Sequence, residues 1–265
     1  MLAVERRQEI FELLQSFGSV TVSDLALRFS VSEETIRRDL SRMERKGLLQ
    51  KTYGGAFLDT GMHREIPVTV RQHAAIEGKS VIGCLAADLI HNGDTIFLDA
   101  STTAVHIAEN ILEKSNLVVI TNALPVAETL ARAEHIKVIC AGGTLRPKAL
   151  SLVGKAAEGS IASFFADKAF ICCDGVHLHH GVTDSNEQEA EVRKQMMRQA
   201  LSSILVCDAS KFDRTSFAKL AELDAFDAVI TDQQRPPEWV ERFVQSEVEY
   251  ICGSSEKRIP ESTVV

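Results

Sequence analysis

Five apolar segments of the chain end in short polar stretches whose residue types suit the binding of a small anionic or hydroxylated ligand. The clearest begins at Asp99 and continues as Ser101, Thr102 and Thr103, immediately before a helical pattern. Hydroxyls and free backbone N–H groups at a helix N-terminus form an anion site, so phosphate is the expected ligand, although a plain helix cap has the same pattern. Glycines let a ligand approach the backbone, and Asp and Asn side chains suit sugar hydroxyls. The other stretches are Thr121-Asn122, Gly142-Gly143, Asp174-Gly175 and Asp208-Ala-Ser-Lys211.

A later segment, residues 180–200, adds a second set of polar groups. Its apolar residues recur with helical spacing, so most of its charges are expected to face solvent. Lys211 differs because it directly follows a buried strand, where an isolated Lys has no structural reason to lie. We therefore expect Lys211 to contact a ligand. The open candidates in the helical segment are Thr183, Glu189, Arg193 and Lys194.

Histidines and cysteines lack the spacing of a metal site. His177, His179 and His180 share a Gly-bounded loop without companion ligands at helical or CxxC spacing. The six cysteines are scattered through apolar runs and form no CxxC pair, which indicates reduced, buried thiols. The sequence thus predicts no metal, no cofactor and no catalytic residue.

A basic stretch lies near the N-terminus of a chain whose formal net charge is −8. Between residues 36 and 51, six Lys or Arg side chains stand against two carboxylates, whereas residues 58–265 hold 20 basic and 29 acidic side chains. Only the front of the chain therefore has a charge balance suited to a polyanion such as DNA.

The first sixty residues have the pattern of three helices and a hairpin. A helical pattern ends at Gly18, and a capping box from Thr21 to Asp24 predicts a second helix. Ser32 is a plausible N-cap for a third helix. Residues 48–58 alternate between apolar and polar side chains around Gly54-Gly55, which predicts a two-stranded wing. Together these elements predict a winged helix-turn-helix.

The third helix is predicted to present a basic face to solvent. Ile36, Leu40 and Met43 share its buried face, so the arginines project from the other side. A charged helix can simply be solvated, but a short turn followed by an exposed helix with small polar residues at its start is typical of a recognition helix in the major groove. Asp39 and Glu44 are expected on the surface, where they would limit non-specific binding. The predicted contacts to bases or phosphates are Ser32, Thr35, Arg37, Arg38 and Arg42, with Lys51 and Tyr53 on the wing.

The rest of the chain alternates short β-branched runs with helical segments. This alternation predicts a parallel sheet covered by helices, with ligand sites in loops at the carboxyl ends of the strands. The polar stretches described first follow such runs. We therefore predict a winged helix-turn-helix domain (1–58), a linker (59–75) and a larger α/β domain (76–265). The seven runs are DTIFLDA, NLVVITNA, IKVICAGG, DKAFICCDG, SILVCDAS, FDAVITD and VEYIC.

The bulk composition is that of a globular protein. The chain has 265 residues, 45% hydrophobic and 25% charged, and no apolar run near the roughly 18 residues of a membrane span. The first ten residues carry charges where a signal peptide needs an apolar core. We therefore predict a cytoplasmic protein with no membrane partner.

The chain resembles the DeoR family of bacterial transcriptional regulators over nearly its whole length. The front resembles the helix-turn-helix of the family, including TIRRDL and the Gly-Gly wing, and the rear resembles its sensor domain through DASTT, VVITNAL, AGGTLRP, VTDSNEQEAEVRK and DASKF. The resemblance implies a sensor fold similar to ribose-5-phosphate isomerase and CoA transferases, a phosphorylated sugar or related effector, and a repressor of a carbohydrate operon. It also implies that these residues surround the effector: Asp99, Ser101, Thr102, Thr103, Asn122, Gly143, Asp174, Glu189, Arg193, Lys194 and Lys211.

The leading hypothesis is a repressor that binds a double-stranded operator and loses affinity for it when the effector binds. One winged module makes few phosphate contacts, so a homodimer or homotetramer is expected. One alternative is a sugar-phosphate isomerase or transferase-like enzyme with an appended DNA-binding head, because Asp and Lys could serve as acid and base. Another is a module whose Arg face binds an acidic protein.

Overall fold

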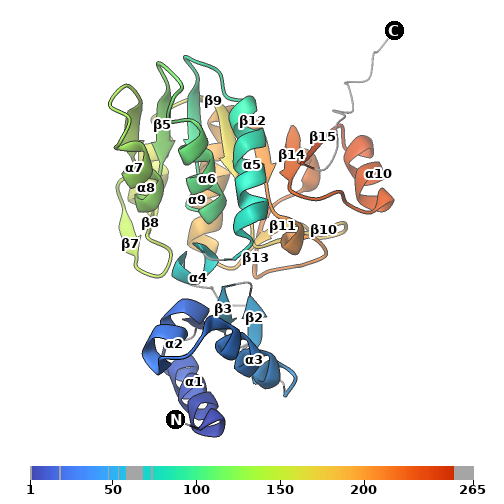
Figure 1. The fold of residues 1–265 in the computed structure, drawn as a ribbon. Helices are drawn as coiled ribbons and strands as arrows, with labels where there is room; N and C mark the ends of the chain where they lie inside the picture. Colours follow the sequence, from blue (N-terminus) through green and yellow to red (C-terminus); the bar gives the residue numbers. More distant parts are fainter. Residues whose placement is uncertain are drawn as a thin grey trace. The chain divides into compact units, whose positions relative to one another are not determined.

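The chain folds as two units, Met1–Ile76 and Glu77–Val265, which are called here the head and the sensor unit. The structure is a computed structural model, and it describes residues 2–17, 19–46, 48–52, 54–57, 68–72 and 74–253. Figure 1 labels the helices and strands of both units. No helix in these described ranges combines the length and apolar character that a membrane crossing requires.

The three helices predicted for the first sixty residues are present in the head. They are α1 (Ala3–Phe17), α2 (Val22–Phe29) and α3 (Glu33–Glu44). The Thr21 hydroxyl accepts a hydrogen bond from Asp24 N at 3.0 Å, and the Ser32 hydroxyl accepts one from Thr35 N at 3.3 Å. Both predicted caps are therefore present, and each satisfies a backbone donor that the helix leaves free. The core between the helices contains Ile10, Leu14, Leu25, Ile36, Leu40 and Met43.

The predicted two-stranded wing is present, and a third strand, which was not predicted, extends it. Strands β2 (Gln50–Thr52) and β3 (Gly55–Phe57) form the expected antiparallel hairpin, and β1 (Ser19–Thr21) pairs with the other side of β3. Gly55 makes this third strand possible, since a Cβ there would lie 2.0 Å from the carbonyl oxygen of Val20. The strand was missed because three residues are too few to show a period-2 pattern.

The predicted linker falls only partly on described residues. Residues 68–72 form a short helix, α4 (Val68–Gln72), which contacts β1, and Val68 is buried. Residues 58–67 and 73 lie outside the described part of the chain. The domain boundaries at 58 and 75 therefore stay a prediction.

The sensor unit contains a seven-stranded sheet in which every neighbouring pair is parallel, as predicted. Its order is β15-β14-β12-β9-β4-β5-β6, so β9 and β4 lie in the middle and β6 lies at one edge. Each of the seven β-branched runs supplies one strand. The bounds are β4 (Thr95–Leu98), β5 (Val118–Thr121), β6 (Lys137–Cys140), β9 (Ala166–Ile171), β12 (Ala200–Val206), β14 (Ala228–Thr231) and β15 (Glu249–Cys252).

Helices cover both faces of this sheet, and each face has its own core. Along β4, Phe97 belongs to one core while Ile96 and Leu98 belong to the other, as the alternation of side chains requires. The core of Ile96 includes residues of α5 (Ile76–Asp88), α6 (Thr102–Asn110) and α7 (Leu124–Leu130). The core of Phe97 includes residues of α8 (Lys155–Ile161), α9 (Glu187–Arg198) and α10 (Pro237–Gln245). Figure 1 shows α5 and α6 in front of the sheet.

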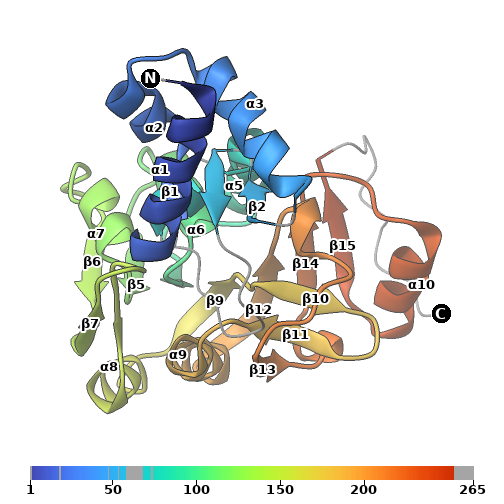
Figure 2. The same cartoon turned by 90° about the horizontal axis from the view of Figure 1, so that it is seen from below.

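Two smaller sheets lie outside this frame, and the sequence did not predict them. One is the hairpin of β7 (Thr144–Arg146) and β8 (Ser151–Val153). The other is antiparallel and combines β10 (Gly175–His177), β11 (Gly181–Asp184) and β13 (Ala218–Ala221). Figure 2 shows this second sheet beside α9, which contacts β11 and β13.

The expected loop of histidines and the expected burial of all cysteines need correction. His177 is the last residue of β10, and its ring lies 4.6 Å from that of His180, centroid to centroid. All six cysteines are free thiols, but Cys84 and Cys140 are exposed. Cys84 lies on an outward position of α5, and Cys140 ends the edge strand β6, so an apolar sequence context did not guarantee burial at either position.

Candidate functional site

The exposed face of α3 carries the predicted arginines. Arg37, Arg38 and Arg42 are all exposed, and the Arg38 side chain is 79% exposed. Arg37 and Arg38 each form an ion pair with the carboxylate one turn earlier, on Glu33 at 2.8 Å and on Glu34 at 3.1 Å. Surface pairs of this kind contribute little to stability, so both guanidinium groups can exchange these partners for phosphate or base oxygens.

The first turn of α3 presents hydroxyls. Ser32 is exposed and Thr35 is half-buried, and their hydroxyl oxygens lie 2.9 Å apart. A recognition helix contacts bases mainly through its N-terminal residues, and hydroxyls can contact either bases or phosphates. The geometry therefore keeps both residues as DNA-contact candidates.

The wing is hydrogen bonded to α3 through Lys51. Its ammonium donates to the Ser41 hydroxyl at 2.7 Å, and its backbone N–H donates to Glu44 Oε1 at 2.8 Å. Lys51 is consequently half-buried and held against α3, and its expected contact with the DNA backbone stays a prediction. The other wing candidate, Tyr53, lies outside the described residues.

Asp39 does not lie on the surface, and that expectation was wrong. The residue is only 5% exposed, and its carboxylate accepts hydrogen bonds from Arg6 and Arg7 of α1. The partners of Asp39 lie more than thirty residues earlier in the chain, so the pattern of charges within α3 does not reveal them. Glu44 is exposed, as expected.

Asp99 and Arg193 form the centre of the polar cluster in the sensor unit. Asp99 follows β4 and is fully buried; its Oδ2 accepts from Cys172 N at 2.9 Å and from Arg193 Nε at 2.6 Å. Arg193 also binds Asp184 with its Nη1. Burial alone would lower the pKa of Arg193, but the Asp99 carboxylate offsets this and the net pKa is raised. The guanidinium therefore stays charged, and it joins α9 to two strand ends.

A second ion pair, between Lys211 and Asp174, belongs to the same cluster. The Lys211 ammonium lies 3.5 Å from Asp174 Oδ1, and Asp174 Oδ2 accepts from Ser185 N at 3.1 Å. Burial lowers the pKa of Lys211, whereas Asp174 and Asp208 raise it, and the net pKa is above the ordinary value. Asp174 also acts on Arg193 electrostatically, so the two ion pairs share one polar region.

An aromatic contact fixes the backbone that carries Lys211. The residue ends a single 3-10 turn, η1 (Ala209–Lys211), and Phe212 follows it. The Phe212 ring packs edge-on against Trp239, with centroids 4.8 Å apart and planes at 89°. Trp239 is fully buried, and its Nε1 donates to Asp213 at 3.1 Å. The position of Lys211 is therefore coupled to α10.

The residues at the start of α6 are buried, and one of their hydroxyls caps the helix. The Ser101 hydroxyl accepts a hydrogen bond from Ala104 N at 3.0 Å. Ser101 is therefore a helix cap, which the sequence offered as the alternative to an anion site. Thr102 and Thr103 are also buried, and Thr103 Oγ1 lies 3.8 Å from Cys172 Sγ. The Thr103 hydroxyl therefore lies beside the Asp99 cluster, because Cys172 contacts Asp99 as well.

Asn122 and Gly143 position the β7–β8 hairpin. Asn122 Nδ2 donates to the carbonyl of Leu152 at 3.0 Å. Gly143 has a φ of +135°, and a Cβ there would lie 2.7 Å from the carbonyl oxygen of Val153. Within the described part of the chain, Asn122 Oδ1 and Asp99 Oδ1 are buried acceptors without a hydrogen-bond partner. Unsatisfied buried acceptors are costly, and they are suited to hydroxyl donors of a ligand.

The sequence missed several polar residues of this cluster. Glu189 accepts from Arg146 Nη1 at 2.6 Å and from the Ser151 hydroxyl, so β7, β8 and the first turn of α9 are connected. Arg146, Ser151 and Asp184 had not been singled out as site residues. These residues lie in the short strands β7, β8 and β11, which the sequence did not predict, so their positions at the site could not be recognised.

Lys194 is not part of this cluster. Its ammonium pairs with Glu191 at 2.8 Å, and both side chains are partly exposed. Thr183 is buried and donates to the carbonyl of Gly175 at 3.1 Å, so it stabilises the small sheet. The helical segment thus contributes Glu189 and Arg193 to the polar cluster, but it does not contribute Lys194.

The thiols at the strand ends remain protonated at neutral pH. Burial, assisted by Asp99, raises the pKa of Cys172 to about 12. A hydrogen bond with Cys207, together with burial, raises the pKa of Cys173 well above its usual value. Neither residue can supply a thiolate nucleophile at neutral pH.

Comparison with known proteins gives the family. Residues 6–61 match the DeoR-like helix-turn-helix domain, and residues 74–233 match the DeoR C terminal sensor domain. The transcriptional regulator YulB of Bacillus subtilis is 38% identical, over 97% of this chain and 100% of its own. The glycerol-3-phosphate regulon repressor of Escherichia coli is 32% identical, over 89% of this chain and 93% of its own. A solved ribose-5-phosphate isomerase in complex with phospho-erythronic acid is 13% identical, with a TM-score of 0.38 over 51% of this chain and 52% of its own. The chain belongs to the DeoR family of transcriptional regulators.

Proposed function

We propose that this protein represses genes of carbohydrate metabolism by binding operator DNA through α3 and the wing, and that a phosphorylated sugar or related intermediate releases it. The observation that carries the proposal is that α3 has one buried apolar face and one exposed basic face. Ile36 and Leu40 are fully buried on one side, while Arg37, Arg38 and Arg42 are exposed on the other. A helix built in this way suits the major groove.

The polar cluster of the sensor unit supports a small-molecule effector. It combines a buried cation, Arg193, and a half-buried one, Lys211, with carboxylates and hydroxyls at the carboxyl ends of parallel strands. The cations and the start of α6 suit a phosphate, and the buried acceptors suit hydroxyls. The glycerol-3-phosphate regulon repressor among the relatives is named for genes of a phosphorylated metabolite, which agrees with this choice.

The same cluster supports binding without turnover. A general base accepts a proton and must therefore be deprotonated at the working pH, but the raised pKa of Lys211 keeps its ammonium protonated there. Cys172 is likewise held as a thiol. We therefore propose a sensor rather than an isomerase or transferase, and no turnover of sugar phosphates is expected.

The effector must bind two states of the protein with different affinity in order to change DNA binding. We propose that the protein acts as a homodimer or homotetramer, because one winged module contacts few phosphates and two half-sites raise both affinity and specificity. Effector binding would change how the paired heads are held.

A gel-shift titration of the full chain against the DNA upstream of its own gene tests the proposal. We expect a saturable complex whose affinity falls with added salt and which a phosphorylated sugar dissociates. Arg38→Ala should weaken the complex, whereas Arg132→Ala, the same change at an exposed position of the sensor unit, should not. Absence of a salt-sensitive complex with and without every effector would refute the proposal.

A thermal-shift screen against phosphorylated sugars identifies the effector class. A ligand at about 100 times its dissociation constant adds roughly 2.7 kcal/mol to the folded state. The compounds that shift the melting temperature should also dissociate the DNA complex. Steady conversion of any of them to product would instead favour the enzyme.

A further inference from the structure

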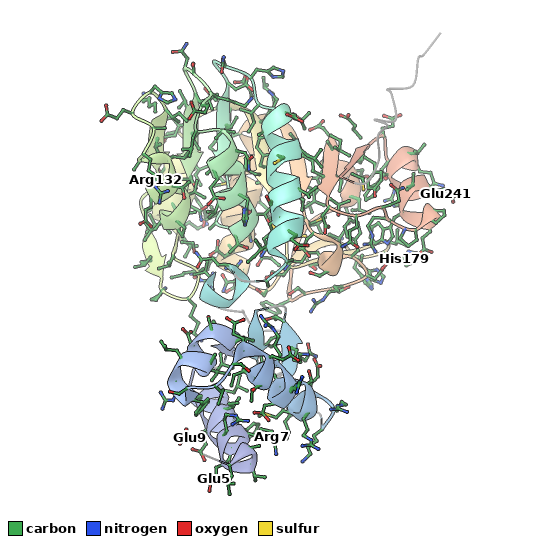
Figure 3. All side chains as sticks on the ribbon, viewed as in Figure 1. Glu5, Arg7, Glu9, Arg132, His179 and Glu241 are labelled. Atoms are coloured by element: carbon green, nitrogen blue, oxygen red, sulfur yellow. The ribbon has the colours of Figure 1, made fainter. Side chains whose placement is uncertain are left out.

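Asp39 connects the recognition helix to α1 through an ion-pair cluster that also contains Arg6 and Arg7. Arg6 approaches Asp39 Oδ2 with Nε at 2.7 Å and with Nη2 at 2.6 Å, and Arg7 Nη1 lies 2.7 Å from Asp39 Oδ1. Each carboxylate oxygen therefore has its own arginine. The Arg6 side chain is 9% exposed and the Arg7 side chain 18%. Figure 3 labels Arg7 on α1, on the side next to α3.

The position of Asp39 on α3 gives this cluster a role in orienting the helix. Thr35 lies four residues before Asp39 and Arg42 three residues after it, so both neighbour Asp39 on the helix surface. Both are also expected DNA contacts. The apolar residues Ile36 and Leu40 hold the helix against the core, but apolar contacts tolerate small rotations because they are not directional. Hydrogen bonds to both carboxylate oxygens restrict that rotation.

We propose that Asp39 is a positioning residue that sets the rotation of α3 about its own axis and thereby determines how well the protein discriminates its operator from other DNA. The inference rests on the proposed DNA-binding function. Asp39 touches no base or phosphate. It acts through Arg6 and Arg7 on the direction in which Thr35, Arg38 and Arg42 project.

A purely electrostatic role predicts the opposite result when Asp39 is neutralised. Removing a negative charge near DNA strengthens phosphate binding for every sequence alike. Loss of orientation instead weakens base contacts, which exist only on the operator, and leaves phosphate contacts largely intact. The ratio of operator affinity to affinity for unrelated DNA therefore distinguishes the two roles.

Three variants of the full chain separate these effects. Asp39→Asn removes the charge and one set of acceptor bonds while keeping the size of the side chain. Arg6→Lys keeps every charge but cannot reproduce the two contacts of the guanidinium with Oδ2. Glu9→Gln is the matched control, because it removes one negative charge at an exposed position of α1. The preferred duplex is first selected with the unmodified protein, and dissociation constants are then measured on it and on a scrambled duplex.

Asp39→Asn and Arg6→Lys should each lower the ratio of the two affinities roughly tenfold, the size expected for one misplaced base contact. Glu9→Gln should change both affinities in the same direction and leave the ratio unchanged. Circular dichroism melting shows whether each variant is folded at the assay temperature, and if Asp39→Asn is not, Arg6→Lys decides alone.

Two outcomes overturn the inference. In the first, folded Arg6→Lys keeps a ratio of operator affinity to scrambled-duplex affinity that is within twofold of the ratio for the unmodified protein. In the second, Asp39→Asn raises the affinity for the operator and the affinity for the scrambled duplex by the same factor. Either result would leave the proposed function intact, because the unmodified protein would still select an operator. A failure of the proposed function is different, since the unmodified protein itself would then select no duplex.

Discussion

Arg193 Nε lies 2.6 Å from Asp99 Oδ2, and this contact joins α9 to the end of the central strand β4. Both side chains are buried, and Asp184 binds the other arm of the same guanidinium. One cation thus compensates two buried carboxylates. Removing it would leave both carboxylates in a low-dielectric environment without a counter-ion.

Arg193→Met should destabilise the sensor unit by about 3–5 kcal/mol, the cost of breaking a buried ion pair by removing one partner. Urea denaturation followed by circular dichroism measures the loss. Lys194→Met is the matched control on the next residue of α9, where the cation pairs with Glu191 in a partly exposed position. It should change stability by less than about 0.5 kcal/mol, and equal losses in both variants would contradict the burial argument.

Lys211→Gln should weaken effector binding roughly 10- to 100-fold, because a charged hydrogen bond contributes about 1.5–3 kcal/mol. Isothermal titration with the compound that gives the largest thermal shift measures the change. Lys219→Gln alters a lysine whose ion pair with Glu222 is exposed, so its affinity should equal that of the unmodified protein. An unchanged affinity in Lys211→Gln would place the effector elsewhere.

Effector affinity should vary less than about twofold between pH 7 and pH 9. The raised pKa of Lys211 means that its pairing with Asp174 is fully present below the unfolded-state pKa of about 10.4, and is lost only as the pH rises through the higher folded-state value. Below pH 7 the affinity should fall as the phosphate of the ligand gains a proton near its second pKa of about 6. A steep change between pH 7 and pH 9 would contradict this expectation.

Gly55→Ala should disrupt the head. The added methyl group would lie 2.0 Å from the Val20 carbonyl oxygen, so β1 and β3 could not keep their pairing. We expect a loss of about 3 kcal/mol or more and of operator binding, measured by thermal melting and gel shift. Gly159→Ala in α8 meets no heavy atom within 4 Å and should instead add about 0.5–1 kcal/mol through helix propensity.

Thiol titration of the native protein should detect two reactive groups out of six, one fast and one slower. Cys84 and Cys140 are exposed, whereas the other four are buried and Cys172 has a pKa of about 12. Burial also raises the pKa of Cys140, which lowers its thiolate fraction and slows its reaction until the pH is increased. Denaturant should release all six, and Cys84→Ser should remove the fast group. Rapid native modification of Cys172 would contradict its burial.

The main sheet could be predicted from the sequence because most of its strands are buried on both faces. Runs such as LVVI and AFICC are continuously apolar, and helices separate them, which is the pattern of parallel strands. The small sheets gave no such signal. Strands β1, β7 and β10 have three residues each, and they are defined by what they pair with rather than by their own composition.

The candidate site was predictable where a single residue type had an unusual local position. Lys211 after a buried strand and Asp99 before a helix are examples. Residues that depend on distant partners were not predictable: Arg193 meets Asp99 across 94 positions, and Asp39 meets Arg6 across 33. No local spacing distinguishes Arg193 from Lys194, and only packing assigns one to the interior and the other to the surface.

Trp239 gives the protein a built-in optical reporter. It is the only tryptophan of the chain, and its buried indole contacts Phe212, the residue after Lys211. A ligand that binds Lys211 and displaces its backbone would alter the surroundings of that indole. The intrinsic fluorescence of Trp239 can therefore follow effector binding in real time without any dye or label. The rate of sensing thereby becomes measurable separately from the rate at which DNA is released.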